Sequence, residues 1–211
     1  MPLQNRVRPD GEIVISPARG MLMGNRGGKL HDPATQTLIR TQSSRQWITC
    51  VLDFKSRQRQ VMGNGYTELF FMDEVTALAA GHRPCFECRR KDAVSFQAAW
   101  KASQVLAVAP SAPDMDRALS VERRAKGGAK ITWAARPDSL PDGAMVRVGE
   151  QLMAVRGRKF LPWAASGYGA PVPLDLNIAV EVLTPPTIAR ILHAGYQPIW
   201  HPSIERAGNK I

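Results

Sequence analysis

Two cysteines separated by two residues, Cys85 and Cys88, constrain this chain more than any other feature of its sequence. At that spacing a single tight turn can bring both sulfurs to one tetrahedral zinc ion. The neighbouring cations Arg83, Arg89 and Arg90 favour the thiolate form that a metal requires. A pair of buried thiols and a redox pair are the alternatives. A redox pair usually stands at the start of a helix after a strand, whereas here a helix is expected before it. The spacing therefore predicts a zinc site.

The residues on either side of these cysteines predict a strand and three helices. Residues 68–71 are apolar and typical of a strand, and Asp73 is suited to cap an alanine-rich helix that Gly81 ends. After the cysteines, apolar residues recur at helical spacing between 89 and 104. A second charged helix is expected over 114–126.

Further strands are expected on both sides of this region. Residues 47–54 and the segment around Val61 are β-branched and aromatic, and a turn is expected at residues 63–65. From residue 130 on, short apolar runs alternate with Pro, Gly and Asp, which is typical of a small antiparallel sheet or partial barrel. The expected strands there are residues 131–134, 145–148, 152–155, 159–163 and 178–183. A last helix is expected to begin at residues 184–187 and to end at Gly195.

These elements predict an α+β fold in two parts. The N-terminal part is expected to be stapled by zinc and to contain a β-hairpin and helices, and the second part to be rich in antiparallel strands. The expected divisions are a flexible tail over 1–20, a zinc-binding α+β region over 21–127, and a β-rich region with a C-terminal helix over 128–211.

The charge balance points to an acidic partner. The chain has 28 Lys and Arg against 18 Asp and Glu, which gives a formal net charge of +10. Such a surface attracts the phosphate backbone of nucleic acids by releasing counterions, although a generic basic surface is the plainer interpretation. Between residues 19 and 59 the cations face only Asp32 and Asp53. We therefore expect a nucleic acid as partner, and DNA in preference to RNA. The side chains expected to contact it are Arg26, Lys29, Arg45, Lys55, Arg57, Arg59, Arg83, Arg89 and Arg90.

The sequence also indicates where the protein resides. No segment approaches the roughly 18 consecutive apolar residues that a membrane span needs. The N-terminal residues lack the apolar stretch of a signal peptide, and three cysteines do not form a disulfide framework. We therefore expect a cytoplasmic protein with no membrane partner.

One stretch resembles a known family. Residues 79–89, Ala-Ala-Gly-His-Arg-Pro-Cys-Phe-Glu-Cys-Arg, follow Phe70, Phe71 and the alanine-rich helix. This order is similar to the metal-binding domain of the Ada methylphosphotriester DNA repair proteins, over about twenty residues. The resemblance implies a zinc ion held by four cysteines. It also implies that one of an earlier Cys-x3-Cys pair irreversibly accepts a methyl group from a DNA phosphotriester.

Carried over to this chain, the resemblance assigns Cys85 and Cys88 to the later pair and Cys50 to one member of the earlier pair. Phe54 stands where the second member would be, so the fourth ligand must come from elsewhere. His31, His82 and Asp53 are the candidates. His82 takes an aromatic position of the motif, where a side chain more often packs than binds metal. Asp53 lies at an odd offset from Cys50 on one strand and so points to the opposite face. His31 is therefore the preferred ligand. Water or substrate in an open fourth position is the alternative, which would indicate a catalytic site.

Two further groups of residues have both a functional and a structural interpretation. Paired carboxylates on two expected helices are suited to acid–base work, but most such acids are caps or solvated side chains. Aromatic residues in the second half are suited to stacking on unpaired bases, although core packing is the commoner role. The carboxylates are Asp73, Glu74, Asp114, Asp116 and Glu122, and the aromatic residues are Trp163, Tyr168, Tyr196 and Trp200, with His193 and His201 nearby.

The sequence therefore leads to one principal functional hypothesis and two alternatives. The principal hypothesis is a zinc-containing DNA-binding protein that acts in DNA repair by methyl transfer to zinc-bound Cys50. The first alternative is a zinc-dependent hydrolase or nuclease in which metal-bound water attacks a nucleic acid. The second is a non-catalytic interaction module stapled by zinc.

Overall fold

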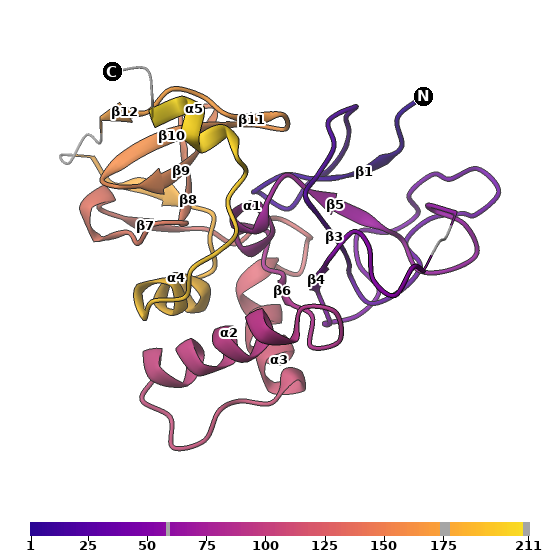
Figure 1. Ribbon diagram of the computed structural model, residues 1–211, viewed down its shortest axis with the longest axis horizontal. Helices are drawn as coiled ribbons and strands as arrows, with labels where there is room; N and C mark the ends of the chain where they lie inside the picture. The colour runs from indigo at the N-terminus through magenta and orange to yellow at the C-terminus, as the bar shows by residue number, and fades with distance from the viewer. Residues whose placement is uncertain (58–59, 174–177, 209–211) are drawn as a thin grey trace.

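Two β-sheets lie on either side of the short helix α1 (Glu74–Ala79) in the computed structural model, as Figure 1 shows. The structure describes residues 1–57, 60–173 and 178–208. The first sheet has the strand order β2-β1-β5-β3-β4-β6. The second has the order β11-β10-β9-β8-β13-β7, with β12 paired to β10. The mixed α+β class predicted from the sequence is therefore confirmed.

The strands of the first sheet alternate between residues buried in the core and residues on the opposite face. On β3 and β5 the buried residues include Leu22, Leu69 and Phe71, whereas Met23 and Phe70 lie on the other face. Gly24 lets β3 approach β4, since a Cβ there would lie 2.1 Å from the carbonyl oxygen of Ile48. The strands are β1 (Gln4–Val7), β2 (Ile13–Ile15), β3 (Leu22–Asn25), β4 (Ile48–Cys50), β5 (Leu69–Phe71) and β6 (Arg83–Pro84).

The N-terminal residues belong to this sheet, so the flexible tail predicted over 1–20 is wrong. β1 and β2 form an antiparallel pair, and β1 also pairs in parallel with β5, where Val7 is aligned with Phe71. Val7 is buried in the core with Leu69 and Phe71. The sequence did not reveal this pairing because its partner strand lies more than sixty residues further along the chain.

The connection from β4 to β5 contains no strand among its described residues, so the strand expected around Val61 is wrong. The backbone N–H of Met62 instead donates to the carboxylate of Glu68 at 2.8 Å. The N–H of Gly63 donates to the carbonyl of Gln60 at 3.2 Å, which makes a turn. This segment therefore loops over the outer face of the sheet.

The second sheet has the antiparallel arrangement expected from the sequence. Its central strands pair in register, with Val146 aligned with Met153 and Val182 aligned with Val146. The strands are β7 (Trp133–Ala135), β8 (Met145–Val148), β9 (Gln151–Arg156), β10 (Lys159–Ala164), β11 (Gly167–Tyr168), β12 (Val172–Pro173) and β13 (Val180–Val182), and a single 3-10 turn, η1 (Pro137–Ser139), lies between β7 and β8.

Three further helices pack on one another beside the sheets. They are α2 (Arg90–Ser103), α3 (Ala112–Arg123) and α4 (Pro186–His193), and α5 (Ser203–Gly208) follows near the C-terminus. Their shared core contains Phe96, Met115, Leu119 and Ile191. The helices predicted over 89–104 and 114–126, and the helix after Thr184, are confirmed. Helix α3 begins before the predicted residue 114 because Ser111 caps it. The Ser111 hydroxyl accepts a hydrogen bond from the N–H of Asp114.

Helix α1 connects the two sheets, because every one of its residues is buried. Val75 packs in a core with Met145 and Leu161 of the second sheet, whereas Ala77 packs with residues of the first sheet. The two parts expected on either side of residue 127 therefore share hydrophobic cores. No helix in the described part of the chain is long and apolar enough to cross a membrane.

Candidate metal centre

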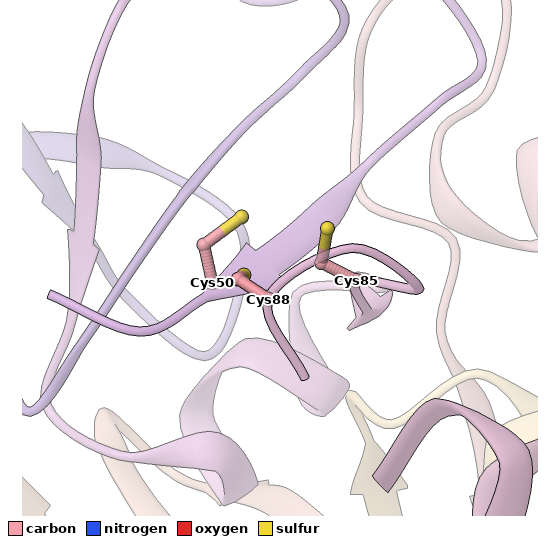
Figure 2. Close-up of side chains that lie close together, drawn as sticks. All are labelled: Cys50, Cys85 and Cys88. Carbon is pink, nitrogen blue, oxygen red and sulfur yellow. The ribbon is translucent and has the colours of Figure 1, made fainter. Parts of the chain in front are cut away.

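The parallel pair of strands β4 and β6 brings the three cysteines together. Cys50 is the last residue of β4, and Cys85 directly follows β6. The N–H of Cys85 donates to the carbonyl of Thr49 at 2.9 Å, which fixes the two strand ends side by side. A tight turn then returns the chain to Cys88, and α2 begins two residues later. Figure 2 shows the three side chains gathered from the end of β4 and from this turn.

The three sulfurs form a group that fits one metal ion. All three lie within 4.8 Å of one another, and none is in a disulfide. Zinc–sulfur bonds of about 2.3 Å in a tetrahedral site place sulfurs roughly 3.8 Å apart. Small side-chain rotations from the observed positions are enough to reach that geometry. The three sulfurs could therefore hold zinc.

The three thiols differ in pKa because they lie next to one another and are unequally hydrogen-bonded. A hydrogen bond from Cys50 is the main cause that lowers the pKa of Cys85 to about 5, and backbone N–H groups of Cys88 and Glu87 add to it. That same hydrogen bond and burial raise the pKa of Cys50. Burial is the main cause that raises the pKa of Cys88. Cys85 is thus the thiol that loses its proton most readily, and a cation at the centre would displace the remaining protons.

The arginines near the motif have structural partners. Arg83 forms two hydrogen bonds with the carboxylate of Asp116, at 2.9 and 2.8 Å. Arg89 is paired with Glu74 at 2.9 Å and donates to the hydroxyl of Thr49 at 2.8 Å. The lowered pKa of Cys85 therefore comes mainly from hydrogen bonds, and not from these arginines as the sequence suggested.

His31 does not join the three sulfurs. Its side chain is fully buried, with Nδ1 2.6 Å from the hydroxyl of Thr67 and Nε2 2.8 Å from the carbonyl oxygen of Gly63. Both nitrogens that could bind a metal are therefore engaged elsewhere. This geometry does not support the prediction that His31 is the fourth ligand.

The other two candidates for the fourth position also lie elsewhere. His82 is buried between Trp47 and Phe71, with ring centroids 4.9 and 4.7 Å away, and Asp53 is exposed. Among the described residues no fourth Cys, His, Asp or Glu joins the group. The arrangement therefore leaves room for a fourth ligand from outside the chain.

A cavity of about 400 Å³ opens beside the three sulfurs. The register of the sheet explains its floor, because Met23 of β3 is aligned with Cys50 on one side and with Phe70 on the other. The loop between β4 and β5 supplies much of the wall. The lining residues are Met23, Asn25, Ile48, Cys50, Val51, Leu52, Phe54, Arg57, Val61, Tyr66, Glu68, Phe70, Cys85, Glu87 and Cys88.

The cavity is not positively charged. Arg57 is its only cationic lining residue among those described, and it pairs with Glu87 at 3.0 Å. Glu68 is buried at the cavity and accepts the N–H of Met62. The two carboxylates outweigh the single guanidinium group of Arg57. An anionic group entering this cavity would therefore meet repulsion.

The predicted nucleic-acid contacts divide into two sets. Arg26, Arg83 and Arg89 are buried, which corrects their assignment as surface contacts. Their guanidinium groups are taken up by hydrogen bonds, ion pairs and ring stacking inside the protein. Arg59 lies outside the described residues. The exposed members of the set are Lys29, Arg45, Lys55, Arg57 and Arg90.

The paired carboxylates have structural roles. Asp73 caps α1 and accepts the hydroxyl of Tyr168 at 2.8 Å, and Glu74 accepts the hydroxyl of Tyr196 at 2.7 Å. Glu122 binds Thr187 at the start of α4. Asp114 lies in the exposed first turn of α3 and pairs with Arg117. They hold elements together and do not gather around a reaction centre.

The aromatic residues proposed as stacking platforms also serve the core. Tyr168 and Tyr196 are buried, and Trp163 donates its ring N–H to the hydroxyl of Thr76 at 3.0 Å. Trp200 packs against Tyr168 with ring centroids 5.6 Å apart. His193 is exposed, and His201 is hydrogen-bonded to Ser203. Core packing is therefore their role in this structure.

Sequence reasoning missed the cavity, although part of its signal was present. Asn25, Met23 and Phe70 occupy the outward positions of β3 and β5, alternating with buried neighbours. Period-two alternation could have placed these side chains on the face that carries Cys50. Nothing local shows that Glu68 is buried there.

Family models, curated proteins and solved structures were all compared with the chain, and none matches it. The chemistry of the centre is therefore argued from its own geometry.

Proposed function

We propose that the protein binds nucleic acid and transfers a methyl group, or a similarly small alkyl group, from that substrate to a cysteine of a zinc centre. The centre would consist of Cys50, Cys85 and Cys88. The observation that carries the proposal is that all three sulfurs converge at the wall of one cavity. When bound, zinc would keep the sulfurs deprotonated at neutral pH and therefore nucleophilic.

Cys50 is the best candidate for the acceptor. Cys85 accepts hydrogen bonds from the backbone N–H groups of Glu87 and Cys88, and Cys88 accepts one from that of Val51. The pKa of Cys50 is shifted instead by the other two thiols and by burial. N–H donors withdraw electron density from a thiolate, so the sulfur without them is the stronger nucleophile. This argument agrees with the role that the Ada resemblance implies for Cys50.

The charge of the cavity favours a neutral reacting group. Glu68 and Glu87 line it together with the sulfurs, and Arg57 is neutralised by Glu87. A phosphodiester carries a negative charge that the two carboxylates would repel, whereas the phosphotriester formed by its methylation is neutral. The apolar side chains of Met23, Phe54 and Phe70 suit a small alkyl group. The substrate group that fits best is therefore a phosphotriester in a nucleic-acid backbone.

The proposed step balances without a further reactant. The Cys50 sulfur forms a bond to the methyl carbon while the bond between that carbon and the phosphate oxygen breaks. The phosphodiester leaves with the electron pair and recovers its negative charge. Cys50 becomes a thioether, so one molecule of protein accepts one methyl group.

The leading alternative is a zinc-dependent hydrolase, which the room for an external fourth ligand favours. Two observations weigh against it. Three thiolates donate much charge to a metal and weaken it as a Lewis acid, and the carboxylates of the cavity would repel a phosphodiester. A structural staple, the other alternative, does not require a cavity at the sulfurs.

A direct experiment uses the zinc-loaded protein and an oligonucleotide with one methyl phosphotriester. The expected result is that intact protein gains the mass of one methyl group, which peptide mapping locates on Cys50. The same oligonucleotide without the methyl group, and the Cys50→Ser variant, should give no gain. Binding without mass gain would refute alkyl transfer, and shortened oligonucleotide products would establish the hydrolase instead.

A further inference from the structure

A second depression of about 540 Å³ lies between the loop before β4 and the C-terminal end of α3. Four cationic side chains line it, together with the hydroxyl groups of two serines and a threonine from the loop and of Ser120 from α3. None of its described lining residues is acidic. We call it the cationic groove; its lining residues are Thr41, Gln42, Ser43, Ser44, Arg45, Ser120, Arg123, Arg124, Ala125, Lys126 and Gly128.

Two buried guanidinium groups add positive charge at this groove. Arg123, which lines it, and Arg26, behind it, both stack on the ring of Trp47, at 4.7 and 4.0 Å from its centroid. Both side chains are buried, yet no described carboxylate forms an ion pair with either. They donate instead to backbone carbonyls, such as that of Arg45, and to His82. A buried cation normally has an anionic partner, so this site lacks one within the described chain.

The acidic groups nearby are too few to neutralise the groove. Glu12 lies 3.4 Å from Arg124, and Asp116 is already bound to Arg83. Burial and the neighbouring arginines lower the pKa of Lys130, whose backbone forms an isolated β-bridge with the backbone of Arg124. The excess of positive charge is thus felt inside the protein as well as at its surface.

The loop that forms one wall is held in a fixed shape. The N–H groups of Ser43 and Ser44 donate to the carbonyl of Arg26, at 3.0 and 3.2 Å. The ring N–H of Trp47 donates to the carbonyl of Ser44 at 3.1 Å, and Arg26 donates to that of Thr41. The carbonyls of the loop are therefore turned inward, while Thr41, Ser43 and Ser44 remain exposed. A wall with its acceptors turned away and its donors exposed suits an anion.

We infer that the cationic groove binds phosphate groups of a nucleic-acid backbone. The choice of a nucleic acid as their source rests on the proposed function. Four cations and several hydroxyl donors in 540 Å³ exceed the needs of a single phosphate and suit successive phosphates of one strand. The groove supplies the positive surface that the cavity at the cysteines lacks.

The groove and the thiols occupy opposite ends of the same two strands. Arg45 precedes β4 and Cys50 ends it, whereas Gly81 precedes β6 and Cys85 follows it. Gly81 also contacts the groove from within, since a Cβ there would lie 2.5 Å from Cγ of Arg123. Phosphate binding and the three sulfurs are thus assigned to separate sites, so the groove can be altered without touching a metal ligand.

Charge reversal at matched positions tests the inference. Arg45→Glu with Lys126→Glu alters two exposed side chains of the groove, and Lys55→Glu with Arg57→Glu makes the same charge change beside the cysteines. Lys101→Glu with Arg158→Glu repeats it at two exposed positions outside both sites. Binding of a labelled single-stranded oligonucleotide is measured at several salt concentrations, and binding of inorganic pyrophosphate by calorimetry.

The groove pair should weaken oligonucleotide binding by about tenfold or more and reduce its salt slope by about two, while the other pairs change far less. Equal losses for all three pairs, or a loss confined to the pair beside the cysteines, would overturn the inference. Pyrophosphate binding that is lost in the groove pair, without any oligonucleotide binding by the parent, would overturn the nucleic-acid source. The zinc content of the groove pair should remain unchanged, whereas its methyl acceptance should fall only as far as its oligonucleotide binding falls, so the inference and the proposed function are tested separately.

Discussion

Cys50 and Cys85 stand side by side because they occupy equivalent ends of two parallel strands, β4 and β6, that are distant in the sequence. The N–H of Cys85 donates to the carbonyl of Thr49, and the guanidinium group of Arg89 donates to the hydroxyl group of Thr49. The metal centre therefore depends on tertiary pairing. The turn from Cys85 to Cys88 supplies only two of the three sulfurs.

Replacing Phe54 by Cys should create a fourth thiolate ligand. Phe54 lines the cavity beside the sulfurs, in the loop that follows Cys50. A sulfur there would occupy the position otherwise left to water or substrate, which favours zinc binding. The absorption spectrum of the cobalt-substituted variant should change from three to four sulfur ligands. Phe54→Ser is the control for loss of the ring, and an unchanged cobalt spectrum in Phe54→Cys would show that residue 54 cannot reach the centre.

Removing the carboxylate partner of Arg83 should destabilise the protein strongly. The Arg83–Asp116 pair is buried and doubly hydrogen-bonded, so Asp116→Asn leaves a guanidinium charge without its counterion. The expected loss in the free energy of unfolding is about 3–5 kcal/mol. Urea unfolding would measure it, with the exposed Asp114→Asn as the control, for which about 0.5 kcal/mol or less is expected. Similar losses for the two variants would contradict a structural role of the pair.

Lys130 should make stability depend on pH. Burial and the nearby Arg124, Arg26 and Arg123 lower its pKa from 10.5 to about 7 in the folded protein. Between pH 7 and 10.5 the unfolded chain therefore binds more protons than the folded one, and stability rises with pH across that window. Below about pH 7 lysine is protonated in both states, and its full penalty remains.

The Lys130→Met variant should remove this slope. Relative to the parent it should be more stable at pH 6–7, by up to about 5 kcal/mol before the loss of its hydrogen bond to Ala79. This gain in stability should vanish near pH 10.5, whereas the cost of the lost hydrogen bond should be the same at every pH. The neighbouring exposed Lys126→Met is the control. Parallel stability curves for Lys130→Met and the parent would contradict the cause assigned to this slope.

Local features of the sequence predicted local structure well. The spacing of Cys85 and Cys88, the Asp73 cap and the apolar spacing through Phe96 and Trp100 each depend on neighbours a few residues away. The cap and the apolar spacing predicted α1 and α2, and the short apolar runs between Pro, Gly and Asp after residue 130 predicted the antiparallel strands of the second sheet.

The features that the sequence could not predict depend on distant partners. Arg26 and Arg83 looked like surface cations because Trp47 and Asp116, which receive them, are remote in the chain. His31 is engaged by Thr67 and Gly63, so its metal-binding nitrogens are not available. The N-terminal residues join the first sheet through a parallel pairing with β5 that no local pattern reveals. In each case packing, and not residue type, decided the role.

Loss of one sulfur should weaken the centre sharply. Cys50→Ser should lower zinc affinity by about 100-fold or more, which corresponds to about 2.7 kcal/mol, because only the two sulfurs of the turn remain. Competition with a chromophoric chelator would measure the affinity. Ser103→Ala, on α2 and outside the cavity, provides a control that should bind zinc like the parent. Zinc bound equally tightly by Cys50→Ser would exclude Cys50 as a ligand.

The most direct test of the metal centre is X-ray absorption at the zinc edge of the purified protein. The expected spectrum has three sulfur neighbours at about 2.3 Å and one oxygen or nitrogen neighbour at about 2.0–2.1 Å. The light neighbour should disappear in Phe54→Cys and be replaced by a fourth sulfur. Protein that binds no zinc, or zinc with two sulfur neighbours or fewer, would contradict a centre built from Cys50, Cys85 and Cys88.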